Sequence, residues 1–167
     1  MIKQKSLKII KWSLIIALVY TTSCDTSRHS ESYVSLTNLK WHKDSTVCIE
    51  MEEVDDINSS YNIALMMRHT TDFKYKNMYF FIDVYSPSGE LVLRDTANII
   101  LQNPQGYWYG DGSGFLKEIG THEIKGNYKN NTRFPEKGSY KFCITHGMRD
   151  EVLENVADLG IRIEYAN

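Results

Sequence analysis

The chain has 167 residues, of which 42% are hydrophobic and 12% aromatic, and it contains only 3 prolines. This apolar content is sufficient for a packed core and excludes intrinsic disorder for the bulk of the chain. The formal net charge of -2 gives no electrostatic basis for binding nucleic acid or an anionic lipid surface.

The chain begins with the pattern of a secretory signal peptide. Four lysines and no acidic residue precede or border the apolar run at residues 12–20. A membrane-spanning helix needs about 20 apolar residues, so this run is too short to cross a bilayer. We therefore expect residues 1–23 to be a cleaved signal peptide.

A cysteine follows directly. In the bacterial lipoprotein pattern, small residues precede a cysteine that is lipidated and becomes the first residue of the mature chain. Thr22 and Ser23 meet this requirement ahead of Cys24, although Thr21 stands where the pattern usually has leucine. The sequence thus predicts a lipid anchor at Cys24 and attachment to a membrane.

Cleavage would leave 144 residues, which corresponds to one domain. It would also leave 15 basic and 21 acidic residues, a formal charge of -6. Residues 25–32 are polar throughout, which predicts a flexible tether. We expect a signal peptide at 1–23, the lipidated cysteine and tether at 24–35, and a folded domain at 36–167.

The folded domain has the sequence period of β-strands. Apolar residues occupy alternate positions in residues 47–51, 61–67, 80–84 and 140–144, with further strand-like runs at 97–101, 121–128 and 161–165. Ser86-Pro-Ser-Gly89 has turn residues and predicts a β-hairpin. Eight or so short strands indicate an all-β fold, a single antiparallel β-sandwich of the immunoglobulin-like or jelly-roll type.

One segment has a different period. Val152, Leu153, Val156 and Leu159 follow helical spacing, and Gly160 stands where a helix would end. The pattern predicts one or two helical turns before the last strand.

Apart from Cys24, the chain has one pair of cysteines, Cys48 and Cys143. Each occupies a polar position of its predicted strand, and an even number is typical of proteins in an oxidising compartment. A disulfide would require the two strands to be neighbours. Two free thiols remain the alternative, because connectivity does not follow from sequence alone.

No motif for metal binding or catalysis stands out. His122-Glu123 begins like a zinc-protease motif, but Gly126 occupies the position of the second histidine. There is no Gly-x-Ser-x-Gly elbow, and scattered acids such as Asp83 and Asp95 define a glycosidase pair only by their separation in space. We expect no enzyme, no metal and no cofactor.

The most unusual composition is three consecutive aromatics, Tyr107, Trp108 and Tyr109, between glycines and followed by Asp111. One interpretation is a binding platform for a sugar ring or an extended partner segment, with Asp111 as a polar contact. In the other, Trp108 fills one end of the sandwich and the glycines permit a tight bend. Arg149 is a second candidate, either for binding or for an ion pair with Asp95 or Asp158.

Several segments occur in an order and spacing that resemble one known family. They include Trp41, Tyr61-Asn-Ile-Ala-Leu-Met-Met-Arg68, Arg94-Asp-Thr96, Gly106-Tyr-Trp108, Gly138-Ser-Tyr140 and Met148-Arg149. Together they resemble the gliding motility lipoprotein GldH family of Bacteroidetes. The resemblance implies an outer-membrane lipoprotein of the envelope machinery connected with gliding and its coupled secretion system, without a known catalytic residue or cofactor.

These observations favour a non-enzymatic, lipid-anchored protein that binds another envelope or secretion-machinery protein. The alternative is a glycan-binding surface lipoprotein that uses Tyr107, Trp108 and Tyr109. Asp44-Ser45-Thr46 and Asp95-Thr96-Ala97 also resemble the acceptor pattern for periplasmic O-glycosylation in that phylum, which makes Ser45 and Thr96 candidate acceptors.

Overall fold

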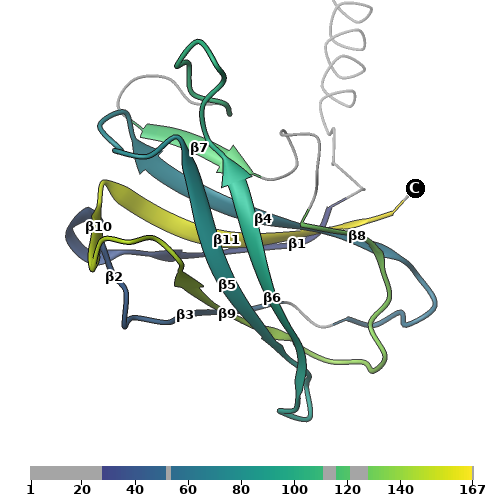
Figure 1. Cartoon of the computed structure of the whole chain (residues 1–167). Helices are drawn as coiled ribbons and strands as arrows, with labels where there is room; N and C mark the ends of the chain where they lie inside the picture. The colour runs from purple at the N-terminus through teal and green to yellow at the C-terminus, as the bar shows by residue number, and fades with distance from the viewer. Residues whose placement is uncertain (1–27, 52–53, 111–115, 121–127, 167) are drawn as a thin grey trace, which may run out of the picture.

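The computed structural model describes residues 28–51, 54–110, 116–120 and 128–166, which form two stacked antiparallel sheets (Figure 1). The first sheet has the order β1 (Arg28–Ser35), β11 (Val156–Tyr165), β4 (Tyr61–Thr70) and β7 (Leu116–Gly120), and β8 (Lys129–Thr132) also pairs with β4. The second has the order β3 (Val47–Glu50), β9 (Lys141–His146), β5 (Asn77–Tyr85) and β6 (Leu91–Ile100). The predicted antiparallel sandwich is confirmed.

A small two-stranded sheet closes one end of the sandwich. It pairs β2 (Lys40–His42) with β10 (Val152–Glu154), and a 3-10 turn, η1 (Thr37–Leu39), leads into β2. Trp41 of β2 is fully buried, and its Nε1 donates a hydrogen bond to the Ser45 carbonyl oxygen at 2.8 Å. The centroid of its ring lies 5.2 Å from that of His146 and 6.1 Å from that of Phe80, so the Trp41 ring covers this end of the core.

The core lies between the inner faces of the two sheets. On β5, Phe80, Ile82 and Val84 are buried while the residues between them face outward, as the period of two requires. Opposite them, Ile63 and Leu65 of β4 are buried as well. In Figure 1, β5 and β6 cross in front of β4 and β11, so the two sheets meet face to face at their centres.

The predicted hairpin at residues 86–89 joins β5 to β6 and is confirmed. The Gly89 amide donates to the Ser86 carbonyl oxygen, and the Ser86 amide donates to that of Glu90, both at 2.9 Å. Gly89 has a φ of +86°, a conformation that glycine adopts without steric cost.

The predicted tether is too long, because residues 28–35 form β1. Their polar composition predicts a linker, yet the strand pairs with β11 along almost its whole length. Arg162 of β11 binds Glu31 through two hydrogen bonds, Nε to Oε2 at 3.0 Å and Nη2 to Oε1 at 3.4 Å. An edge strand can be stabilised by such pairs and by ladder hydrogen bonds without apolar alternation. Residues 24–27 lie outside the described part of the chain.

The predicted helical turns are also wrong. Residues 152–154 form β10 and residues 156–165 form β11. Asn155, with a φ of +70°, separates the two strands, and a bulge between Val156 and Asp158 shifts the phase of the second. These two interruptions place buried Leu153, Val156 and Leu159 three residues apart, which imitates the period of a helix.

Gly160 has a packing role that the sequence did not indicate. A Cβ atom at this position would lie 2.5 Å from Cδ1 of Tyr33 and 3.0 Å from the carbonyl oxygen of Ser32. The Tyr33 ring therefore rests on bare backbone, with the Arg68 guanidinium 4.3 Å from the ring centroid.

We expect Gly160→Ala to lower the free energy of unfolding by about 1–3 kcal/mol, because the added methyl group must displace the Tyr33 ring. Urea denaturation measures this loss. In a double-mutant cycle, Tyr33→Ala should recover part of it; an equal loss with and without the ring would contradict the steric explanation.

Burial of His146 predicts a pH dependence. Its side chain is 1% exposed, and burial lowers the pKa of the imidazole, with Lys43 acting in the same direction and Asp150 against it. The folded protein then binds fewer protons than the unfolded chain, so stability falls as the pH drops below the ordinary histidine pKa of about 6.5.

We expect His146→Phe to flatten the decrease in unfolding free energy between pH 7 and pH 5, because the phenyl ring has no proton to gain. The exposed His42 provides the matched control. If His42→Phe flattens the profile and His146→Phe does not, the assignment to His146 is wrong.

Candidate binding surface

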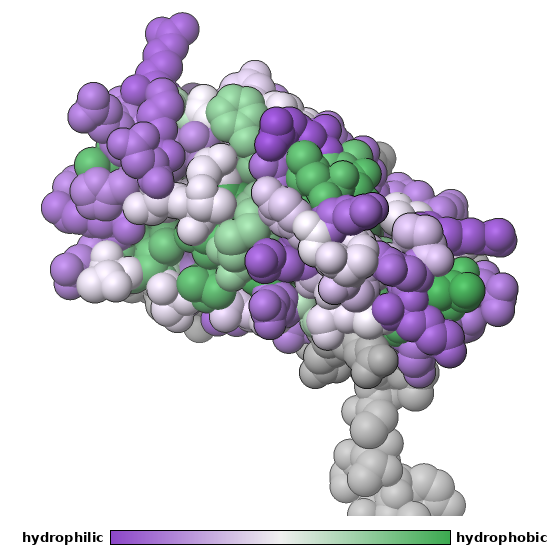
Figure 2. Space-filling view, turned by 90° about the horizontal axis from the view of Figure 1, so that it is seen from below, coloured by the Kyte–Doolittle hydropathy of each residue, from purple (hydrophilic) through white to green (hydrophobic). Residues whose placement is uncertain are grey.

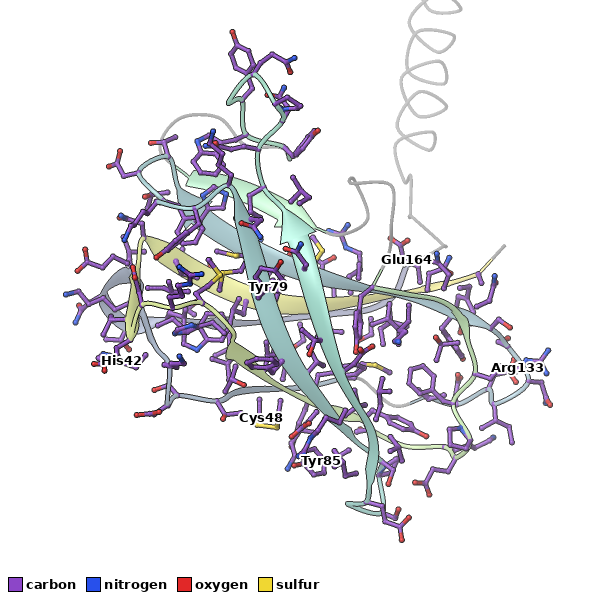
Figure 3. The ribbon with its side chains drawn as sticks, viewed as in Figure 1. His42, Cys48, Tyr79, Tyr85, Arg133 and Glu164 are labelled. Atoms are coloured by element: carbon purple, nitrogen blue, oxygen red, sulfur yellow. A yellow bond between two sulfur atoms is a disulfide. The ribbon has the colours of Figure 1, made fainter. Side chains whose placement is uncertain are left out.

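The outer face of β5 carries aromatic side chains where solvent-exposed strands usually carry polar ones. Tyr79 is 42% and Phe81 50% exposed, and Tyr85 follows on the same side of the strand (Figure 3). They point outward because the alternate residues of β5 fill the core. We call Tyr79, Phe81, Asp83 and Tyr85 the β5 face.

An ion pair fixes the centre of the β5 face. Arg94 of β6 donates two hydrogen bonds to Asp83, from Nε to Oδ1 at 2.7 Å and from Nη2 to Oδ2 at 2.9 Å. These bonds hold the pKa of the Asp83 carboxyl below, and that of Arg94 above, its usual value. Asp83 therefore stays ionised and bound to Arg94. This arrangement suits a structural role at the surface rather than proton transfer.

Two hollows flank Tyr79 and Phe81. One, of about 310 Å³, lies beside Phe81, and its lining residues include Thr145 and Thr96. The other, of about 490 Å³, lies beside Tyr79 and contains Arg149. Figure 2 views the molecule from below Figure 1 and shows apolar patches separated by hydrophilic groups on that side.

Arg149 does not form the ion pair considered from the sequence. Asp95 instead contacts Lys129, with 2.6 Å between Oδ2 and Nζ, and Asp158 lies 3.8 Å from Arg68. Among the described residues no carboxylate pairs with Arg149, which is exposed in the hollow beside Tyr79. Its guanidinium is therefore available to a partner.

Hydrogen bonds and an ion pair join side chains that line the hollow beside Tyr79. Lys74 Nζ lies 3.0 Å from Asp150 Oδ2, and the pKa of Asp150 is held below its usual value by hydrogen bonding to Tyr75 first and to Lys74 second. Met148 is buried against β5, with its Sδ 3.4 Å from the Tyr79 amide nitrogen.

Gly147, the residue after β9, lets the chain pass close to the aromatic side chains of β5. A Cβ atom there would lie 3.1 Å from both Tyr79 Cβ and the Phe81 ring. Sequence reasoning did not select Tyr79 and Phe81 as binding residues, although the signal was present. Once Phe80 and Ile82 are assigned to the core, period-two alternation leaves Tyr79 and Phe81 outside.

Cys48 and Cys143 face each other across β3 and β9 and are joined by a disulfide bond. The bond lies on the same side of the second sheet as the β5 face, because Cys143 is opposite Asp83 in the register. It closes a loop across 95 positions of the sequence and ties the four-residue edge strand β3 to its neighbour.

The three consecutive aromatics do not share one face. Residues 101–109 form a small hairpin in which the Asn103 amide donates to the Tyr107 carbonyl oxygen at 2.9 Å, and Gly106 turns the chain with a φ of +87°. Trp108 is half-buried with its ring 4.5 Å from His69, whereas Tyr107 is 71% exposed. Tyr109 is half-buried. Asp111 lies outside the described residues.

The remaining candidates are accessible or undescribed. Ser45 and Thr96 are both exposed, Ser45 in the turn after β2 and Thr96 opposite Phe81 on β6. Cys24 lies outside the described residues. Their modification remains a prediction.

The described residues contain no group of three or more His, Cys, Asp or Glu side chains that could hold a metal ion. In that part of the chain, no helix is long and apolar enough to cross a membrane. Asp83 and Asp95 point to opposite faces of the second sheet, because Asp95 is paired with the buried Ile82, so these two acids do not form a facing pair.

Comparison with known proteins decides the family. The family model described as GldH lipoprotein matches residues 28–163, which is nearly the whole described domain. The chain belongs to the GldH lipoprotein family.

Two GldH relatives are similar over most of their length. The gliding motility lipoprotein GldH homolog of Christiangramia forsetii is 33% identical over 157 residues, covering 90% of this chain and 91% of the relative. Gliding motility lipoprotein GldH of Flavobacterium johnsoniae is 30% identical over 158 residues, covering 90% and 93%. As members of a lipoprotein family, these chains are membrane-anchored and are associated with gliding motility.

Solved structures resemble the GldH chain only distantly. The VP2 subviral particle of infectious bursal disease virus aligns with a TM-score of 0.33 at 14% identity, over 86% of this chain and 34% of that one. A carbohydrate-binding module of the β-sandwich superfamily aligns with a TM-score of 0.34 at 9% identity, over 88% and 59%. Neither bears on function.

The hairpin predicts opposite outcomes for neighbouring aromatics. Trp108→Ala should lower the free energy of unfolding by about 2 kcal/mol, because it removes a half-buried ring from the core. Tyr107→Ala should change it by less than about 0.5 kcal/mol. Thermal denaturation of the two variants tests this, and equal losses would contradict the placement of the rings.

Proposed function

We propose that this protein is a non-enzymatic, lipid-anchored envelope protein whose β5 face binds another protein of the envelope or secretion machinery. The observation that carries the proposal is the exposure of Tyr79 and Phe81 at the middle of a sheet rather than at its margin. Aromatic residues and arginine supply much of the binding energy at protein interfaces, and Arg149 and Arg94 lie beside these rings.

Membership of the GldH family supports the cellular setting of this function. We infer that Cys24 carries the acyl anchor and that the membrane is the outer membrane. Because β1 begins at Arg28, three residues separate Cys24 from the folded domain, a reach of about 10 Å when extended. The domain would therefore lie close to the lipid surface, and its partner would be another membrane-bound or membrane-proximal protein.

The ion pairs of two acidic residues on the second sheet support the non-enzymatic role. Asp83 and Asp95 are each held by a cation, and these two carboxylates face opposite sides of the sheet. Glycan binding through three stacked aromatics has less support, because Trp108 packs inward and leaves Tyr107 as the projecting ring. The side chains of the β5 face point away from the core, so a partner protein can contact them.

Site-specific photocrosslinking in native membranes tests the proposal. We expect p-benzoylphenylalanine at position 81 to give an adduct of defined mass. The Arg149→Ala variant should reduce its yield about tenfold, because truncation of an interface arginine commonly removes 1–2 kcal/mol or more.

Position 57 provides the control, because Ile57 is 39% exposed but lies away from the β5 face, in the segment before β4. The same photoreactive residue there should give no such adduct. No adduct from position 81, or equal yields from positions 81 and 57, would refute the β5 face as the binding surface.

A further inference from the structure

A third hollow, separate from the two beside the β5 face, opens at the edge of the sandwich. Its volume is about 340 Å³, and it lies between β6 and the segment that follows β8. Its walls are apolar, formed by Ile63, Val84, Leu93, Phe134, Tyr140 and Phe142. Pockets for small molecules start at about 300 Å³, so the volume fits one narrow apolar group.

Cationic side chains stand at the rim of this cavity. Lys129 is bound to Asp95, with 2.6 Å between Nζ and Oδ2. Arg133 is exposed, and no carboxylate in the described part of the chain pairs with it. Its Nε lies 3.5 Å from Ser60 Oγ. An apolar interior with an exposed guanidinium at the mouth matches an apolar chain that ends in a negative charge.

The register places this cavity near the membrane-proximal end of the domain. Arg28 pairs with Glu164, Glu164 with Asn62, and the Asn131 amide donates to Asn62 Oδ1 at 3.2 Å. This row crosses three inter-strand spacings, about 14 Å in all, from the start of β1 to the rim of the cavity. The start of β1, β8 and the C-terminus lie on one side of the molecule (Figure 1), as does Arg133 (Figure 3).

From the apolar walls, the exposed guanidinium of Arg133 at the rim and this position, we infer that the cavity binds one acyl chain of a membrane amphiphile, with its anionic headgroup at Arg133. The acidic charge of the domain disfavours broad contact with an anionic surface. A single molecule drawn into a local cationic rim avoids that repulsion. The inference depends on membrane attachment and not on partner binding at the β5 face.

Photolabelling of the full-length acylated protein tests this inference. The protein is placed in phosphatidylcholine nanodiscs that contain a palmitic acid with a diazirine in its chain, irradiated, and digested for mass spectrometry. We expect labels to concentrate in residues 92–93 and 132–135, which border the cavity.

A substitution that fills the cavity should remove these labels. Val92 lines the cavity, whereas its neighbour Leu91 is similarly exposed, 44% against 46%, and does not. Val92→Trp should reduce labelling of the cavity segments at least about fivefold, and Leu91→Trp should leave it unchanged. Labels spread evenly over the domain, or labels insensitive to Val92→Trp, would overturn the inference.

Charge reversal tests the headgroup. Arg133→Glu should reduce labelling by the carboxylate probe about fivefold but not labelling by its uncharged methyl ester, and Lys137→Glu, an exposed control outside the cavity lining, should affect neither. Equal labelling by both probes in Arg133→Glu would overturn the anionic assignment. Exclusion of both probes from the unaltered protein would overturn the inference, since the cavity would then hold the protein's own acyl chain or nothing.

Discussion

The structure depends on the packing of two inner sheet faces around β4 and β5. Phe80 and Ile82 on one side and Ile63 and Leu65 on the other are almost completely buried. On β5 burial alternates with exposure, so a shift by one residue would expose Phe80 and Ile82, which makes the register of this strand costly to change. The outward direction of Tyr79 and of the rest of the β5 face follows from that constraint.

The margins of the sandwich show how the core is protected where the sheets end. Trp41 closes one end, and at the edge formed by β6 the inward-pointing Asp95 is neutralised by Lys129. Such inward charges on edge strands oppose uncontrolled pairing with other chains. The same arrangement leaves the cavity beside Leu93 open to the outside, so the edge excludes additional strands while admitting a narrow ligand.

Two features separate the candidate surfaces in chemistry and in position. The β5 face is aromatic and polar, carries a fixed ion pair between Asp83 and Arg94, and is braced by the disulfide on β3 and β9. The cavity is apolar inside and lies at the end where β1 begins. One domain can therefore hold a lipid at its membrane-proximal end and still present the β5 face to a protein, because these sites share no lining residue.

The sequence by itself determined the all-β class, the hairpin after β5 and the family, because alternation, turn residues and ordered motifs are local signals. It failed at β1, where pairing with β11 and the bond between Glu31 and Arg162 hold a polar segment as a strand, and at residues 152–160, where Asn155 and a bulge imitate helical spacing. Only the tertiary structure decided that Cys48 lies opposite Cys143 and that Arg133 stands at an apolar cavity. These depend on strand order and register, which arise from contacts between residues far apart in the chain.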